Sequence, residues 1–262
     1  MSGHSKWSTI KRKKGALDAK RGQLFTKISK MITIAAQEGG GDTDTNFSLR
    51  IAVEKAKEAN MPKDNIERAI KRGLGEDGAG SLVEISYEGY GPEGVAVIVD
   101  AMTDNRNRTA AEVRHIFEGN GGSLGADGSV SWQFESKGLF TLKCEKTKKS
   151  DKFGKEDEII KLDLEDCMLE LMEIPGVEDV EEVDFEDEGT SLEVYSSKEN
   201  FASVRDFIDR LNYVVVSSEI IKIPVNVMKV ENVVKEKILK FLETMEENED
   251  VQNVWVNIDV NQ

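Results

Sequence analysis

Charge is divided unevenly along this chain of 262 residues, and the division limits how the chain can fold. Residues 1–72 contain sixteen basic and eight acidic side chains, a net charge of +8, whereas residues 73–262 contain nineteen basic and forty-two acidic ones, a net charge of −23. The two regions meet at RGLGEDGAG, residues 72–80, whose four glycines suit a linker. With 39% hydrophobic residues, the chain has enough apolar material for more than one core. The sequence therefore predicts two or three domains of contrasting charge.

The basic region is patterned as helices. Over residues 17–37 the apolar side chains recur at three- and four-residue steps, which is typical of one face of an α-helix. A second helix is expected from about Asn46. Pro62 then interrupts the chain, and Asp64 stands where it could cap a third helix. These signals predict a three-helix domain over residues 1–75 with a basic arm ahead of it.

Positive charge is densest at the very start, where residues 1–30 hold nine Lys or Arg against a single acid. Lys20 and Lys27, which are seven residues apart, are expected to face away from the apolar side of the first helix. Lys and Arg neutralise phosphates, and an aromatic such as Trp7 in a mobile arm can stack on a base. A basic helix face is also commonly just a solvated surface. The pattern alone leaves both interpretations open.

The acidic region alternates strands and helices. Residues 82–102 are expected to form two strands around a turn, residues 103–122 a helix, and residues 130–135 another strand. A helix at 233–248 and a strand at 251–258 supply elements that this first unit still lacks. The two separated segments are therefore expected to form one α/β domain.

A second unit lies between those segments. Its elements follow the order βαββαβ of the ferredoxin-like arrangement. They are expected at residues 138–144, 156–174, 177–185, 191–197, 199–212 and 214–223. The simplest account is one α/β domain, residues 81–136 and 223–262, interrupted by an acidic ferredoxin-like domain at 137–222. The predicted fold class is α+β, with three domains.

Residues that could carry catalytic chemistry are few. Cys144 and Cys167 are not in a CxxC pair, and the only histidines are His4 and His115, so we expect neither a metal centre nor a cofactor. His115 is expected to be a structural helix residue, because no nucleophile or orienting carboxylate is identifiable beside it. The glycine-rich stretch at 119–125 follows a helix and lacks GK[ST], which argues against a nucleotide loop. The sequence therefore predicts no enzymatic activity.

The motif NRNR, residues 105–108, stands at a predicted helix start and allows two interpretations. Free helix N–H groups and exposed amides there attract phosphate or carboxylate, which would make Arg106 and Arg108 anion or partner contacts. Alternatively, Asn105 or Asn107 caps the helix and the arginines pair with neighbouring acids. Both interpretations stay open.

Sequence signals for location are negative. No stretch of about 18 consecutive apolar residues occurs, and the amino terminus lacks an apolar signal segment, so we expect neither a membrane span nor secretion. Two thiols without a disulfide pattern suit a reducing compartment. The expected location is the cytoplasm.

Four long motifs follow one another along the chain: GHSKWSTIKRKKGALDAKRGQLFTK, NMPKDNIERAIKRG, YEGYGPEGVAVIVDAMTDNRNRTAAEVRHIF and GSVSWQF. They closely resemble the bacterial YebC/PmpR family, to which the mitochondrial translational activator of cytochrome c oxidase also belongs. The likeness covers essentially the whole length. It implies three domains, a helical one followed by two α/β domains with one inserted in the other. The family is described as DNA-binding transcriptional regulators, and some members as ribosome-associated translation factors that ease synthesis of proline-containing stretches.

Carried over by position, the resemblance implies a nucleic-acid surface. Its residues are Lys6, Trp7, Lys11, Arg12, Lys13, Lys14, Lys20, Arg21 and Lys27. The implied partner is DNA, or ribosomal RNA together with ribosomal proteins, and no membrane. A charge of −23 over the remainder opposes wrapping along DNA and suits a basic protein partner. The choice between the two nucleic acids stays open, and the oligomeric state is not predicted.

Overall fold

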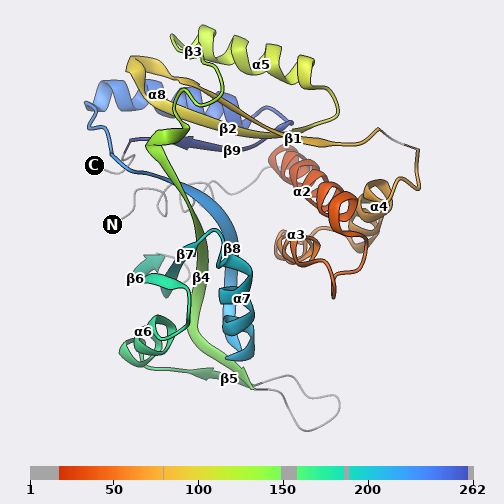
Figure 1. The fold of residues 1–262 in the computed structure, drawn as a ribbon, viewed down its shortest axis with the longest axis vertical. Helices are drawn as coiled ribbons and strands as arrows, with labels where there is room; N and C mark the ends of the chain where they lie inside the picture. The colour runs from red at the N-terminus through yellow and green to blue at the C-terminus, as the bar shows by residue number, and fades with distance from the viewer. Residues whose placement is uncertain (1–17, 79, 149–157, 186–188, 259–262) are drawn as a thin grey trace. The chain divides into compact units, whose positions relative to one another are not determined.

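The structure is a computed structural model. It describes residues 18–78, 80–148, 158–185 and 189–258. It confirms an α+β architecture, in which a helical amino-terminal region is followed by mixed α/β regions (Figure 1). The chain divides into two compact units, residues 1–135 with 223–262 and residues 136–222. The boundaries expected for three separate domains stay a prediction.

Among its described residues, the helical region has three helices, as predicted. They are α2 (Asp18–Gly39), α3 (Phe47–Glu58) and α4 (Lys63–Gly73). Asn46 fixes the start of α3, because its Oδ1 accepts from the N–H of Leu49 at 3.0 Å while its Nδ2 donates to the carbonyl of Ala35 at 2.7 Å. One side chain therefore caps α3 and joins it to α2.

The third helix begins differently from the prediction. Its N-cap is Pro62, which makes no side-chain cap hydrogen bond, and Asp64 lies inside the first turn. The backbone explains the difference, because Pro62 is already in the extended conformation that an N-cap adopts (ψ 139°). Asp64 still favours the helix there, since a negative charge in the first turn complements the helix dipole.

Helices α2 and α4 pack closely at one end. A Cβ added at Gly73 would lie 2.3 Å from the carbonyl oxygen of Thr33, so only glycine permits this approach. The hydroxyl of Thr33 also donates to the carbonyl of Ala69 at 3.1 Å, from α2 to α4. This contact fixes the two helices to each other.

The first unit also contains a four-stranded antiparallel sheet in the order β3-β1-β2-β9. Its strands are β1 (Val83–Tyr90), β2 (Ala96–Thr103), β3 (Ser123–Leu124) and β9 (Val251–Val256). Helices α5 (Arg106–Gly119) and α8 (Asn232–Glu246) pack on one face of it, with the rings of Phe117 and Phe241 5.2 Å apart in the core. As expected, strand β9 thus adds an edge to this sheet and helix α8 packs against it.

The prediction of a strand at residues 130–135 is wrong for most of that range. Ser131–Gln133 form a 3-10 turn, and strand β4 begins only at Phe134. The cause lies in Glu88 on β1, whose carboxylate accepts the N–H groups of Gly128 at 2.9 Å and of Val130 and Ser131 at 2.8 Å each. Burial raises the pKa of Glu88, but these backbone donors outweigh it and hold the pKa below its usual value.

Apart from an additional strand, β5, the second unit has the ferredoxin-like order of elements. They are β4 (Phe134–Lys148), β5 (Glu158–Lys161), α6 (Leu164–Met172), β6 (Val177–Phe185), β7 (Gly189–Ser197), α7 (Phe201–Arg210) and β8 (Tyr213–Pro224). Strands β7 and β8 both pair with β4, and β6 pairs with β7, which is the pairing of a split βαβ sheet. The rings of Phe140 and Phe201 stack 4.9 Å apart beneath it.

The acidic helix expected over 156–174 is shorter than predicted. Residues 158–161 form β5, which pairs antiparallel with residues 145–148 of β4, and α6 starts only at Leu164. Asp163 caps the helix, since its Oδ1 accepts from the N–H of Glu165 at 2.9 Å. Pairing with a long neighbouring strand therefore overrides the local helical pattern.

The chain leaves the first unit and returns to it at neighbouring points. The N–H of Val225 donates to the carbonyl of Gln133 at 2.8 Å, and the amide of Asn257 donates to Oε1 of Gln133 at 3.1 Å. The two ends of the inserted segment are thus hydrogen-bonded within the first unit.

None of the helices in the described ranges has the length and apolar character that a membrane span requires.

Candidate functional site

The nine residues of the implied nucleic-acid surface are only partly described. Lys6, Trp7, Lys11, Arg12, Lys13 and Lys14 lie outside the described residues, as does the side chain of Lys20. Arg21 is exposed on α2, whereas Lys27, one turn and a half later, is half-buried. The structure therefore leaves the role of this surface a prediction and shows the surroundings of two of its members.

Lys27 and its neighbour Lys30 do not point freely into solvent. The Nζ of Lys27 donates to the backbone carbonyl of Glu246 at 2.7 Å, at the carboxy-terminal end of α8. The Nζ of Lys30 donates to the carbonyl of Glu249 at 2.9 Å, in the turn before β9. Lysines next to the last carbonyls of a helix complement its dipole. Part of the basic face of α2 thus attaches this helix to the corner between α8 and β9.

Asp250 is the centre of that attachment. Lys30 approaches its Oδ1 to 2.5 Å, and the guanidinium of Arg108 lies 2.8 Å from its Oδ2. The same Oδ2 accepts the hydroxyls of Thr109 at 2.6 Å and Thr103 at 3.1 Å, and both threonines are fully buried. One carboxylate therefore joins α2, the end of β2, the start of α5 and the start of β9.

The charge of Asp250 is maintained by these contacts. Its side chain is 6% exposed, and burial by itself raises a carboxyl pKa. Hydrogen bonds from Arg108, Lys30 and Thr109 outweigh burial and hold the pKa of Asp250 well below its usual range. The hydrogen bond with Asp250 in turn raises the pKa of the Arg108 guanidinium. Asp250 is therefore ionised at neutral pH and hydrogen-bonded to its neighbours.

The NRNR motif contributes to the same cluster. Asn105 is the N-cap of α5, and its Oδ1 accepts from the N–H of Arg108 at 3.1 Å. Arg108 also lies 3.2 Å from the carboxylate of Asp104. These contacts match the cap-and-ion-pair interpretation for Asn105 and Arg108. Arg106 is exposed, and an anion contact for it stays a prediction.

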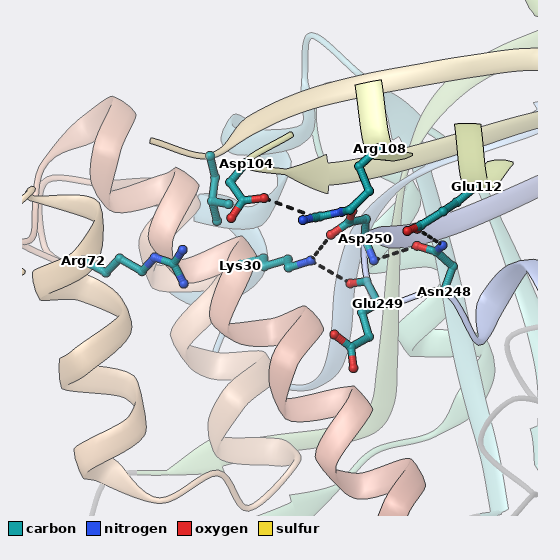
Figure 2. Close-up of a pocket in the computed structure, with 9 residues that line it drawn as sticks. Lys30, Arg72, Asp104, Arg108, Glu112, Asn248, Glu249 and Asp250 are labelled. Atoms are coloured by element: carbon teal, nitrogen blue, oxygen red, sulfur yellow. Dashed lines mark hydrogen bonds and ion pairs between the residues drawn. The ribbon is translucent and has the colours of Figure 1, made fainter. Parts of the chain in front are cut away.

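A cavity of about 490 Å³ opens beside Asp250. Its lining includes Lys30, Arg72, Asp104, Arg108, Glu112 and Glu249. In Figure 2 the guanidinium of Arg72 points from α4 into this space, toward α2. Its Nε is buried and finds no hydrogen-bond partner within the described part of the chain. Among the described residues, Arg72 is thus a cation whose hydrogen bonding is incomplete.

A second hollow, of about 390 Å³, runs between α2 and α4 and shares Lys30 and Arg72 with the first. We call it the α2–α4 groove, and its lining includes Phe25, Ser29, Thr33, Asn65, Arg68 and Arg72. Sequence reasoning missed Arg68 and Arg72. The signal was present, because Asn65, Arg68 and Arg72 are spaced by three and four and lie on one face of α4.

Residues with catalytic potential stand apart from these hollows. His115 is exposed on α5. Burial raises the pKa of Cys144 to about 12, which keeps this thiol protonated and weakly nucleophilic at neutral pH. Over the described ranges, no group of three or more His, Cys, Asp or Glu side chains is placed to hold a metal ion.

Two family models match the chain. One is described as the amino-terminal domain of TACO1/YebC proteins and matches residues 5–76. The other is described as the second and third domain of TACO1/YebC and matches residues 82–258. Together they include every element described above.

Curated relatives match over nearly their whole length. A protein of Natranaerobius thermophilus named probable transcriptional regulatory protein is 48% identical over 260 residues, which cover 99% of this chain and 97% of that protein. A protein of Syntrophus aciditrophicus with the same name is 48% identical over 261 residues, with 99% and 96% covered. A crystal structure of a conserved hypothetical protein from Aquifex aeolicus is 37% identical, with a TM-score of 0.77 and 94% and 93% of the two chains covered.

Proposed function

The chain belongs to the TACO1/YebC family, and on this basis we propose that it is a non-enzymatic regulator of gene expression that binds nucleic acid in the cytoplasm, in the first instance DNA. The observation that carries the proposal is the division of charge, +8 over residues 1–72 against −23 over the rest. A polyanion is attracted to the first part and repelled by the second. The names of the relatives, probable transcriptional regulatory protein, agree with it.

Exposed cations also occur on the helices that follow the basic arm. In the described helical region, Arg21 on α2 and Arg68 on α4 are examples. Contacts between such cations and a nucleic acid neutralise phosphates and release counterions, without reading the bases. The proposed binding is therefore directed at the sugar-phosphate backbone, with weak dependence on sequence.

A second candidate is a ribosome-associated translation factor that assists synthesis of difficult proline-containing sequences. The observation that favours it is the acidic surface of the inserted unit. Exposed acids there include Glu158, Glu165, Asp166, Glu173, Glu178, Asp179 and Glu182. Such a surface opposes wrapping along a duplex but complements basic ribosomal proteins, while the amino-terminal arm contacts ribosomal RNA.

The first experiment compares two variants that change the net charge equally. In the arm variant, Lys11, Arg12, Lys13 and Lys14 are replaced by Glu. In the control variant, the exposed Lys148, Lys161, Lys198 and Lys229 are replaced by Glu. Affinity for a 20-base-pair DNA duplex and for a single-stranded RNA of the same sequence is measured at several salt concentrations.

The arm variant is expected to bind weakly, and its plot of log affinity against log salt should be shallower by roughly three units, because each lost phosphate contact removes about 0.7 to 0.9. The control should keep the wild-type slope. Equal effects of both variants, or none of either, would refute the proposed phosphate contact by the arm.

Ultraviolet crosslinking in cells then separates the two functions. The DNA and RNA crosslinked to the protein are sequenced. Sequencing reads at discrete promoters that disappear in the arm variant support the transcriptional function. Reads concentrated on ribosomal RNA support the translation factor and remove direct promoter binding as the main role.

A further inference from the structure

The α2–α4 groove has one closed and one open end. At the closed end, Thr33 and Gly73 bring the two helix backbones into contact. Toward the start of α2 the helices carry Phe25 and Ser29 opposite Asn65 and Arg68 of α4, and the hollow forms there. Two stripes of side chains, each repeating at three or four residues, therefore make up its walls.

The lining has the composition of an anion site. Arg68 and Arg72 stand against one acid, Asp77, while Lys30, which also lines the groove, is paired with Asp250. Arg68 donates to the side-chain oxygen of Asn65 and, at 3.3 Å, to the carbonyl of Asp64, and both acceptors are neutral. Arginine presents a planar fork that matches the oxygens of a phosphate. The groove thus holds guanidinium groups where an anion can reach them.

Arg72 gives an independent indication of a missing ligand. A buried donor without a partner is costly, and folded proteins rarely leave one. The Nε of Arg72 is such a donor among the described residues, and Arg72 lines both the α2–α4 groove and the cavity beside Asp250. An anionic oxygen in the groove would supply the acceptor that this nitrogen lacks.

We propose that the α2–α4 groove binds a backbone phosphate of a nucleic-acid strand through Arg68 and Arg72. This inference rests on the proposed function and adds a second contact site to the arm. A phosphodiester is favoured over a free anion because the groove is lined by α2, a helix that begins at Asp18, shortly after the KRKK sequence at 11–14. Phe25 adds an aromatic wall, on which a base can stack.

The test uses the full-length chain and a fluorescein-labelled single-stranded 20-mer RNA. Arg68→Gln and Arg72→Gln are each compared with Lys71→Gln, which removes an equal charge from the same helix at an exposed position outside the groove. Each groove variant is expected to bind about tenfold more weakly, with a salt slope reduced by about 0.7. The Lys71 variant should bind nearly as the wild type does.

Two further measurements guard against a folding defect. Arg72→Lys keeps the charge, so its salt slope should match that of the wild type. It should recover only part of the affinity that Arg72→Gln loses, because the planar guanidinium fork is absent. In the wild type, the ¹H–¹⁵N resonance of the Arg72 Nε–H should shift when the RNA is added, and less when cytidine monophosphate or inorganic phosphate is added at equal phosphate. A shift of equal size with inorganic phosphate would reduce the site to a free-anion site and overturn the proposal.

The outcomes separate this inference from the proposed function. If the arm variant loses RNA while Arg68→Gln and Arg72→Gln match Lys71→Gln, the groove proposal falls and the proposed function stands. If the wild type shows no salt-dependent binding of RNA or DNA, the proposed function falls, and the groove proposal falls with it.

Discussion

Replacing Asp250 by Asn tests the cluster that joins the helical region to the first sheet. The substitution keeps the shape of the side chain, removes its charge and turns one acceptor into a donor. Two cations and two buried hydroxyls then face a group that cannot accept from all of them. Breaking a buried ion pair from one side typically costs about 3–5 kcal/mol.

The lower end of that range is expected here. The side chain of Lys30 is 15% exposed, but that of Arg108 is 47% exposed, so solvent screens the second pair and it contributes little. We therefore expect a loss of about 3 kcal/mol in the free energy of unfolding. For a unit of this size that corresponds to a fall of about 6–12 °C in Tm.

The contribution of Asp250 to the free energy of unfolding depends on pH in a definite direction. The pKa of Asp250 is lower in the folded protein than in the unfolded chain, where a carboxyl titrates near 3.9. The ionised group therefore stabilises the fold above that pH, and this contribution disappears as the pH falls toward the folded-state pKa. The stability difference between wild type and Asp250→Asn should be constant from about pH 5 to 8 and shrink below about pH 4.

Urea unfolding followed by circular dichroism, at a series of pH values, measures both effects. Asp104→Asn is the matched control, because it removes an exposed carboxylate from the same Arg108 at 3.2 Å and should cost less than about 1 kcal/mol. Equal losses for the two variants, or a difference that persists unchanged at pH 3, would refute the reasoning.

Four further substitutions probe packing and backbone hydrogen bonding, each measured by urea or thermal unfolding. Gly73→Ala forces a methyl group against the carbonyl of Thr33 and should cost about 1–3 kcal/mol or more, whereas Gly22→Ala, whose methyl meets nothing within 4 Å, should stabilise α2 by about 0.5–1 kcal/mol. Glu88→Gln should cost about 1–2 kcal/mol at pH 7 and less below about pH 4, because the lowered pKa makes its contribution disappear with acid. Phe117→Ala, at a fully buried ring, should cost about 3–5 kcal/mol.

The helices and most strands could be predicted because their patterns are local. Apolar spacing in α2 and alternation in β1 and β2 are properties of short segments, and the structure confirms those elements. The failures come from partners distant in the chain. Residues 158–161 become a strand because β4 pairs with them, and residues 131–133 become a turn because Glu88 binds the backbone there.

The same distinction applies to the candidate site. Density of charge identifies the basic arm from the sequence alone, but it cannot show that Lys27 and Lys30 meet the end of α8. Asp250 is one of fifty acids, and nothing in its sequence neighbourhood marks it as an acid that binds two cations. Arg72 is different, because its spacing with Arg68 is visible in the sequence. That its Nε has no partner within the described ranges appears only in three dimensions.

The hydrogen bond between Val225 and Gln133 has a consequence for the order of folding. Strands β2 and β9 pair across a long stretch of chain, with Val97 opposite Val256, and closing so long a loop is slow. Once residues 136–222 have folded as their own unit, the two ends of that unit are neighbours, and the loop that separates β2 from β9 is effectively shortened. The inserted unit would then act as a folding nucleus for its host, so substitutions that slow its formation should also delay the sheet into which it is inserted.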